Sequence, residues 1–128
     1  MTGKEEILCG LNPAQKKAVT HSDGPLMIIA GAGTGKTTVI TRRIAWLIAQ
    51  KIAKPWEILA LTFTDKAANE MEGRVDLLVP YGFVDVSILT FHAFGDRIIR
   101  DHAIELGLTP DYRVLSMAEQ NIFFRDHI

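Results

Sequence analysis

A run of small residues with one lysine and two threonines, AGAGTGKT at positions 30–37, has a composition suited to binding phosphate. It follows the apolar run 26–29 and precedes a segment whose apolar residues recur at helical spacing. A small-residue loop between a strand and a helix turns several backbone N–H groups toward one point, and the helix N-terminus adds partial positive charge there. The pattern predicts a phosphate-binding loop.

Two side chains of this loop have the chemistry that a nucleoside triphosphate requires. Lys36 is expected to reach the β- and γ-phosphates, and the hydroxyl of Thr37 is expected to hold Mg²⁺. Ala30 stands where the strict motif has glycine, and alanine is small enough to keep the turn. The alternative is a flexible glycine-rich connection with an incidental lysine.

A candidate base-reading residue, Gln15, precedes the loop in the segment LNPAQ at 11–15. Because an amide side chain donates and accepts at once, it can pair with both N6 and N7 of adenine. Taken alone, however, a glutamine on a short helix is more often an ordinary surface residue.

Two further segments carry aromatic, hydroxyl and imidazole groups at the ends of predicted strands. In LTFTDKAA at 61–68, Phe63 could stack on a nucleobase, a contact typically worth about 1–3 kcal/mol, and Thr64 could meet a DNA phosphate. In LTFHAF at 89–94, Thr90 and His92 offer donors suited to phosphate oxygens. Taken alone, Phe63 fits a core position better, and His92 fits an ordinary solvated one.

Strands and helices must alternate to bring these segments together. Asn12 and Pro13 predict the start of a helix that runs to about residue 19. The other predicted elements are a wholly buried strand 26–30, a helix 36–50, a strand 58–64, a helix capped by Asp65, a strand 84–90, a helix 93–105, a short strand 112–115 and a helix 117–127. This order predicts an α/β fold, a parallel sheet with helices on both faces, whose ligand loops meet at the carboxyl ends of the strands.

Helical periodicity also predicts which side chains face the core. In the helix 36–50 these are Ile40, Ile44, Leu47 and Ile48. In the helix capped by Asp65 they are Ala68, Met71, Val75 and Leu78, and Pro80-Tyr81-Gly82 is expected to end that helix.

The composition is that of an ordinary globular protein without a global attraction for nucleic acid. The 128 residues carry a formal charge of −1, so any DNA contact must come from a locally organised face. Cys9 is the only cysteine, which excludes an intramolecular disulfide and a cysteine zinc cluster, and fits a cytoplasmic location. Residues 1–10 do not resemble a signal peptide, and the apolar stretches are too short for a bilayer span.

Four segments resemble, in their order and spacing, N-terminal motifs of the superfamily 1A DNA helicases. That is the UvrD/Rep/PcrA family of ATP-driven translocases on single-stranded DNA. The segments LNPAQKKAV, AGAGTGKTTVITRRIAWL, LALTFTDKAANEMEGRV and ILTFHAFGDRIIR resemble the Q motif, the Walker A loop, motif Ia and motif Ib. The resemblance runs from about Leu8 to the end of the chain, and the joint match is more specific than any one segment.

The resemblance implies a RecA-like P-loop NTPase fold, ATP and Mg²⁺ as cofactors, and single-stranded DNA as the partner. It implies that Gln15 contacts adenine, that Lys36 and Thr37 are catalytic, and that Thr37 holds the metal. The residues implied to wrap the triphosphate are Ala30, Gly31, Ala32, Gly33, Thr34, Gly35, Lys36, Thr37 and Thr38. The residues implied to touch DNA are Phe63, Thr64, Thr90 and His92.

The chain departs from the family pattern at two positions, and family members are several times longer. Thr38 stands where arginine is common. Asp65 stands where asparagine is common, so we expect weaker DNA contact at Asp65 or a role there as helix cap only. Residues 1–110 are expected to be the first part of motor domain 1A, an incomplete RecA-like domain, and 111–128 the start of the inserted 1B subdomain. An Asp-Glu pair after an apolar strand is missing from the sequence, so the chain alone is expected to bind nucleotide at most.

Two functions from other classes remain open at this point. One is a small self-sufficient P-loop kinase or NTPase that acts without DNA and uses Asp65 as its Mg²⁺ carboxylate. The other is a non-catalytic interaction module, in which Lys36 has no role.

Overall fold

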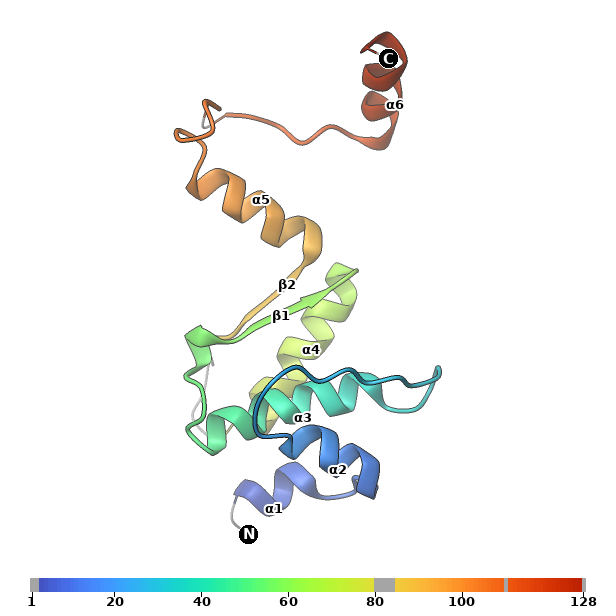
Figure 1. Cartoon of the computed structure of the whole chain (residues 1–128), viewed down its shortest axis with the longest axis vertical. Helices are drawn as coiled ribbons and strands as arrows, with labels where there is room; N and C mark the ends of the chain where they lie inside the picture. The colour runs from blue at the N-terminus through green and yellow to red at the C-terminus, as the bar shows by residue number, and fades with distance from the viewer. Residues whose placement is uncertain (1–2, 80–84, 110, 128) are drawn as a thin grey trace. The chain divides into compact units, whose positions relative to one another are not determined.

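The computed structural model describes residues 3–79, 85–109 and 111–127 (Figure 1). Its elements in chain order are α1 (Gly3–Leu8), α2 (Pro13–Thr20), α3 (Lys36–Ala49), the 3-10 helix η1 (Pro55–Glu57), β1 (Leu59–Thr62), α4 (Asp65–Leu78), β2 (Ser87–Thr90), α5 (Phe91–Asp101) and α6 (Met117–His127). The chain forms two compact units, residues 1–94 and 95–128. The predicted break at Pro80-Tyr81-Gly82 and the predicted start of a strand at residue 84 lie outside the described residues.

Helix α2 begins where the sequence predicts, at a reciprocal pair of side chain–backbone hydrogen bonds. Asn12 Oδ1 accepts from the backbone N–H of Gln15 at 2.9 Å, and Gln15 Oε1 accepts from the backbone N–H of Asn12 at 3.0 Å. These two bonds form a capping box, and Pro13 occupies the first helical position, where its missing N–H is not needed. The cap therefore holds the side chain of Gln15 against the start of its own helix.

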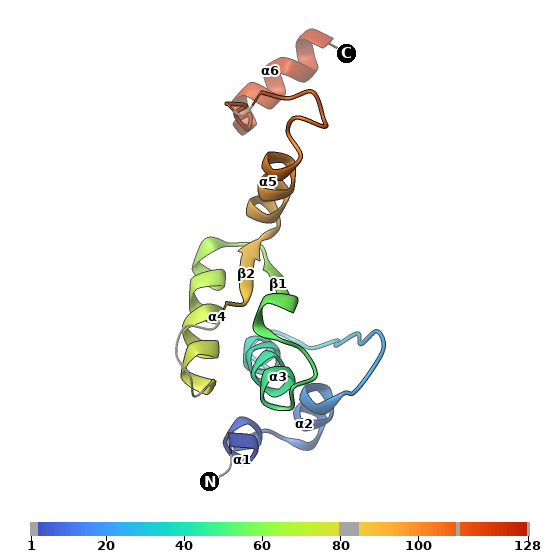
Figure 2. The same cartoon turned by 90° about the vertical axis from the view of Figure 1, so that its left-hand side faces the viewer.

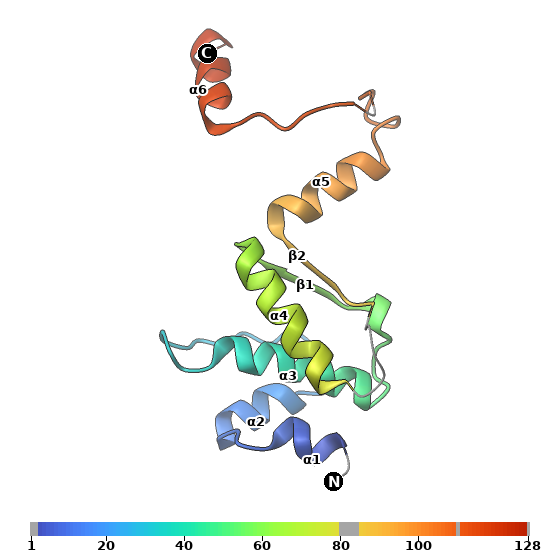
Figure 3. The same ribbon diagram turned by 180° about the vertical axis from the view of Figure 1, so that it is seen from behind.

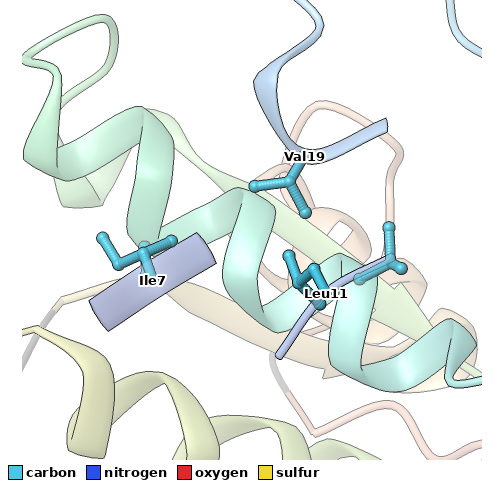
Figure 4. Close-up of a cluster of buried hydrophobic side chains, with 5 residues drawn as sticks. Ile7, Leu11 and Val19 are labelled. Atoms are coloured by element: carbon cyan, nitrogen blue, oxygen red, sulfur yellow. The ribbon is translucent and has the colours of Figure 1, made fainter. Parts of the chain in front are cut away.

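The first core cluster lies between α1, α2 and α3 (Figure 4). Its buried members are Ile7, Leu11, Val19, Val39 and Ala45. Helix α1 is absent from the elements predicted above, although its Ile7 is almost fully buried in this cluster. The packing brings α2, which carries Gln15, onto α3, which begins at Lys36.

Two arginines of α3 tie the carboxyl ends of α1 and α2 to it. Arg42 donates to the carbonyl oxygens of Glu6 at 2.9 Å and Ile7 at 2.6 Å. Arg43 donates to three carbonyl oxygens at the end of α2, those of Ala18, Val19 and His21, at 2.9–3.2 Å. The last carbonyl groups of a helix have no partner within it and carry partial negative charge, so a guanidinium is a favourable partner there.

The sheet within the described residues has two parallel strands, with Leu59 paired to Ser87 and Thr62 to Thr90. Ile58, Ala60 and Ile88 share one face, where they join the second core cluster with Ile44 of α3 and Met71 and Val75 of α4. Figures 2 and 3 show α4 running alongside the two strands and crossing α3. A parallel α/β arrangement is therefore confirmed, whereas the coverage of both faces by helices stays a prediction.

The predicted buried strand 26–30 is wrong as a description of this structure. The segment is neither helix nor strand, and the side chains of Met27 and Ile29 are 84% and 92% exposed. A strand needs ladder hydrogen bonds to a neighbour, and the described sheet pairs only β1 with β2. An apolar run predicts a tendency to be buried, but it does not indicate which other segment of the chain would bury it.

Several predicted boundaries and faces also need correction. The cap of α4 is Thr64, whose hydroxyl accepts from the N–H of Ala67, and Asp65 is the first helical residue. The helix predicted over 93–105 runs from Phe91 to Asp101, and residues 112–115 form no strand. The buried residues of α3 are Val39, Thr41, Ile44 and Ala45, of which Ile44 was predicted. The predicted face of α4 is confirmed at Ala68, Met71 and Val75.

In the second unit, Tyr112 joins the segment that follows α5 to that helix. Its hydroxyl donates to Asp96 Oδ1 at 2.7 Å, and the guanidinium of Arg100 lies 4.9 Å from the centre of its ring. The hydrogen bonds from Arg100 and Tyr112 hold the pKa of Asp96 below its ordinary value.

A second capping box begins α6. Glu119 Oε2 accepts from the backbone N–H of Ser116 at 2.8 Å, Ser116 Oγ accepts from the N–H of Glu119 at 3.4 Å, and Arg113 pairs with the same carboxylate. The Ser116 backbone bond, with the bonds from Arg113 and the Ser116 side chain, lowers the pKa of Glu119 from 4.5 to about 2.

Because the folded pKa of Glu119 lies below its ordinary value, its stabilisation of α6 is present above pH 4.5 and is lost as the pH falls toward about 2. Glu119→Gln should therefore speed amide exchange in the first turn of α6 at pH 7 and have a much smaller effect at pH 2. NMR measures both the exchange and the carboxyl titration. Glu72→Gln, which removes the same charge from α4, should leave α6 unchanged, and a Glu119 midpoint near 4.5 would contradict the prediction.

Candidate functional site

The backbone of the predicted phosphate loop turns at two glycines in the left-handed region. Gly33 has φ 73° and Gly35 has φ 81°, values that side-chain-bearing residues rarely adopt. Gly35 is also the N-cap of α3, so the turn leads directly into the helix. Figure 1 shows the extended connection that leaves α2 and turns back into the first turn of α3 through this loop.

The ammonium group of Lys36 bridges the two residues that begin the loop. Lys36 Nζ donates to the carbonyl oxygens of Gly31 at 2.9 Å and Ala30 at 3.1 Å. Thr34 Oγ1 donates to the same Gly31 carbonyl at 2.7 Å. The loop is thus closed on itself by a cation that has a third N–H available for an anion.

The amide of Gln15 is hydrogen-bonded at both ends, and one of its bonds reaches the loop. Its Nε2 donates to the carbonyl oxygen of Thr34 at 3.1 Å, while its Oε1 accepts from the N–H of Asn12. Gln15 therefore connects the cap of α2 to the phosphate loop across 19 residues of sequence. Gln15 is thus a partly exposed residue whose amide is held by these two bonds.

A pocket of about 340 Å³ lies between α2, the loop and the start of α3. It is lined by Asn12, Ala14, Gln15, Ala18, Ile28, Ile29, Ala30, Gly31, Thr34, Lys36 and Val39. One ammonium, two amides and one hydroxyl line walls that are otherwise largely apolar or backbone, which is the usual character of a ligand pocket. The structure brings Gln15, Ala30, Gly31, Thr34 and Lys36 together around this pocket.

Thr37 and Thr38 follow Lys36 in the first turn of α3. Their carbonyl oxygens both accept from Thr41 Oγ1, at 3.0 and 3.1 Å. The described residues contain no cluster of three His, Cys, Asp or Glu side chains that could hold a metal by themselves. A single hydroxyl such as that of Thr37 fits Mg²⁺ that is held mainly by water and by phosphate oxygens of a bound nucleotide.

Arg74 of α4 is a neighbour of this site that the sequence analysis missed. Its Nη1 donates to Thr38 Oγ1 at 3.4 Å, and its Nη2 pairs with Glu70 one turn earlier. The contact joins residues 36 positions apart, on two helices whose packing no local pattern predicts. It puts a guanidinium beside Thr38, the position where the resemblance leads us to expect arginine.

The second group of predicted residues lies where β1 and β2 end. Thr64 Oγ1 accepts from the N–H of Ala67 at 3.2 Å and so caps α4, and Thr90 Oγ1 accepts from the N–H of Ala93 at 3.1 Å in the first turn of α5. Each hydroxyl uses a lone pair in its cap and keeps its proton for another acceptor. Thr90 is buried and Thr64 is exposed.

Phe63 and His92 stand beside these threonines with their side chains in solvent. Phe63 is 84% exposed, so the core position that its strand context favoured is wrong. His92 is exposed in the first turn of α5. Among the described residues, no member of this second group lines the pocket. None of them takes part in the hydrogen bond that joins Gln15 to the phosphate loop.

The family model of the UvrD/REP helicase N-terminal domain matches residues 11–128. The chain belongs to this family. It is 48% identical over 115 residues to the ATP-dependent DNA helicase PcrA of Bacillus subtilis, in an alignment that covers 90% of this chain and 16% of that relative. It is also 48% identical over 119 residues to DNA helicase II of Rickettsia typhi, covering 91% of this chain and 18% of that relative.

This UvrD/REP family chain thus spans less than a fifth of the length of these relatives. PcrA of Staphylococcus aureus, 40% identical over 120 residues, is covered to 16% of its length. Across residues 3–79, 85–109 and 111–127, no helix has both the length and the apolar character needed to cross a membrane.

Position 35 requires glycine for two reasons: its positive φ and the close approach of the Gln15 side chain. A Cβ at Gly35 would lie 3.1 Å from Gln15 Nε2, on a residue whose φ is already positive. Gly35→Ala should lower the free energy of unfolding by about 1–2 kcal/mol through the left-handed backbone alone. Part of any additional loss should disappear in a Gln15→Ala background, as measured by urea titration.

Gly31→Ala is the matched control, because its Cβ would meet only Thr34 Cγ2 at an ordinary 3.8 Å and its φ is not positive. It should cost much less than Gly35→Ala. Equal costs at the two positions would contradict the geometry described for the loop.

Proposed function

We propose that the loop and the pocket beside it bind ATP, with Lys36 on the β- and γ-phosphates. The observation that carries this proposal is the position of the Lys36 ammonium, hydrogen-bonded to Ala30 and Gly31 at the mouth of a loop that leads into a helix N-terminus. The first N–H groups of α3 have no partner within the helix, so a phosphate there would receive both backbone and ammonium donors. Ala32, Gly33, Gly35 and Thr38 complete the loop that would surround the phosphates.

On the adenine side, Gln15 is the proposed base-reading residue. Its amide nitrogen has a second N–H and its oxygen a second lone pair, so it could pair with N6 and N7 while it keeps its bonds to Asn12 and Thr34. Nucleotide binding and the conformation of the phosphate loop would be coupled through this one side chain.

Mg²⁺, proposed to be held with the hydroxyl of Thr37, would neutralise charge on the transferring phosphoryl group. The residues of this chain contribute by orienting the phosphates: Lys36 and the backbone of the loop hold them, and the bond from Arg74 to Thr38 fixes the side chain beside them.

For the whole protein, we propose an ATP-dependent DNA helicase that moves along single-stranded DNA in the cytoplasm. Family membership and the names of the relatives support this proposal. The proposed architecture is a RecA-like motor domain 1A over residues 1–110, followed by the start of an inserted 1B subdomain over 111–128. By itself the chain is proposed to bind nucleotide and not to unwind DNA.

The DNA contacts are proposed at the carboxyl ends of β1 and β2. Phe63 would stack on a base, and Thr64, Thr90 and His92 would meet phosphate oxygens. The hydroxyl of Thr64 supports this assignment, because it is exposed and keeps an O–H donor while its oxygen accepts from the helix.

Lys36→Ala should weaken binding of Mg-ATP by about 10- to 100-fold, because hydrogen bonds to charged groups are worth about 1.5–3 kcal/mol. Isothermal titration calorimetry on the 128-residue chain measures the affinity. Lys66→Ala, which removes one positive charge from α4 outside the pocket, should bind nucleotide like the wild type. Equal affinities of the wild type and Lys36→Ala would remove the basis of the proposal.

Thr64→Asp tests the phosphate contact without removing the cap of α4, because aspartate is among the best N-cap residues. The added negative charge should lower the affinity for a single-stranded oligonucleotide by about tenfold at low salt, with the effect shrinking as salt screens it. Thr64→Ser, which keeps both the cap and the hydroxyl donor, is the control. Fluorescence anisotropy measures binding, and unchanged affinity of Thr64→Asp would argue against a phosphate at this position.

A further inference from the structure

We propose that Phe91 supports Phe63, and that the two rings together form the platform on which a base of single-stranded nucleic acid stacks. This inference rests on the proposed DNA-binding function and adds a positioning residue to it. Phe91 stands in the chain between Thr90 and His92, two of the residues proposed to touch DNA.

The parallel register brings the two rings together. Thr62 of β1 is paired with Thr90 of β2, so the next residue of each chain segment, Phe63 and Phe91, leaves the sheet at the same level. Their ring centroids are 5.1 Å apart and the ring planes are inclined by 36°. Aromatic pairs prefer offset or inclined arrangements with centroids about 4.5–7 Å apart, and this pair lies within that range.

The two rings differ in exposure in a way that suggests different roles. Phe63 is 84% exposed, whereas Phe91, in the first turn of α5, is 49% exposed. The outer ring has a free face for a ligand, and the inner ring limits the orientations that the outer ring can take. A side chain restricted before binding loses less rotamer entropy when a ligand arrives, so the pair would bind a base more tightly than a free ring would.

The groups around the pair favour a nucleic acid as the occupant. Thr64 follows Phe63 in the chain, is exposed and keeps its hydroxyl donor, whereas Thr90, which precedes Phe91, is buried; His92, which follows Phe91, is exposed. An exposed aromatic face takes the flat, uncharged surface of a base, while hydroxyl and imidazole donors take phosphate oxygens. Asp65 and Lys66 at the start of α4 are also exposed and carry opposite charges, so the local net charge neither favours nor disfavours a nucleic acid.

A stacking role predicts dependence on the base itself. A variant that removes the Phe91 ring should weaken binding to oligothymidylate and leave binding to an abasic sugar–phosphate strand of the same length unchanged. A residue that merely maintained the fold would weaken both ligands to the same extent.

The test measures the affinity of the 128-residue chain for these two strands by fluorescence anisotropy, with Phe91→Leu, Phe91→Tyr, Phe63→Leu and the double leucine variant. Phe91→Leu should lose about 3- to 10-fold in affinity for oligothymidylate, the range expected for loss of an aromatic pair contact. Phe91→Tyr, which keeps the ring, should stay within about twofold of wild type. The double variant should lose less than the product of the two single losses, because the rings act as one unit.

Phe124→Leu, which removes a similarly exposed ring from α6, is the control and should bind both strands like the wild type. Wild-type affinity of Phe91→Leu alongside a weakened Phe63→Leu would overturn the supporting role and leave the DNA-binding proposal intact. Equal losses on the two strands would overturn the stacking role of Phe91. If the wild type binds neither strand, the DNA-binding proposal fails and this inference fails with it. Circular dichroism and urea titration confirm that each variant is folded.

Discussion

The hydrogen bonds from the Lys36 ammonium to the carbonyl oxygens of Ala30 and Gly31 are the interaction on which the site depends. They close the phosphate loop onto the first turn of α3, so the orientation of that helix determines where the loop points. Gly33 and Gly35 make this closure possible, because both occupy backbone conformations that a side chain would strain. Loop, lysine and helix start therefore behave as one structural unit.

Packing around α3 carries this local arrangement to more distant residues. The apolar cluster of Ile7, Val19 and Ala45 and the bonds from Arg42 and Arg43 fix α1 and α2 against α3. Gln15 lies in the first turn of α2, so the packing of α2 on α3 allows its amide to hydrogen-bond to Thr34. The same helix contributes Ile44 to the cluster beneath β1 and β2, which connects the loop region to the sheet.

At the ends of β1 and β2, regular secondary structure by itself brings the second group of candidate residues together. Parallel pairing sets Thr62 level with Thr90, and each strand is followed at once by a helix. The capping threonines are thus needed for the helices, while Phe63 and Phe91 come to lie side by side in solvent. Folding requirements and candidate binding groups coincide at this edge because both follow from the strand-to-helix turn.

The sequence by itself determined the features that depend on neighbours in the chain. The capping box at Asn12 and Gln15, the start of α3 at Lys36 and the buried stripe of α4 are set by residues within a turn or two, so local patterns predict them. Only the tertiary structure decided the bond from Gln15 to Thr34, the reach of Arg74 to Thr38, the pairing of Phe63 with Phe91 and the exposed state of residues 26–29. Each of these depends on which segments, distant in sequence, pack together. The burial and hydrogen bonding of the whole chain determine that packing, and the residue types at any one position do not.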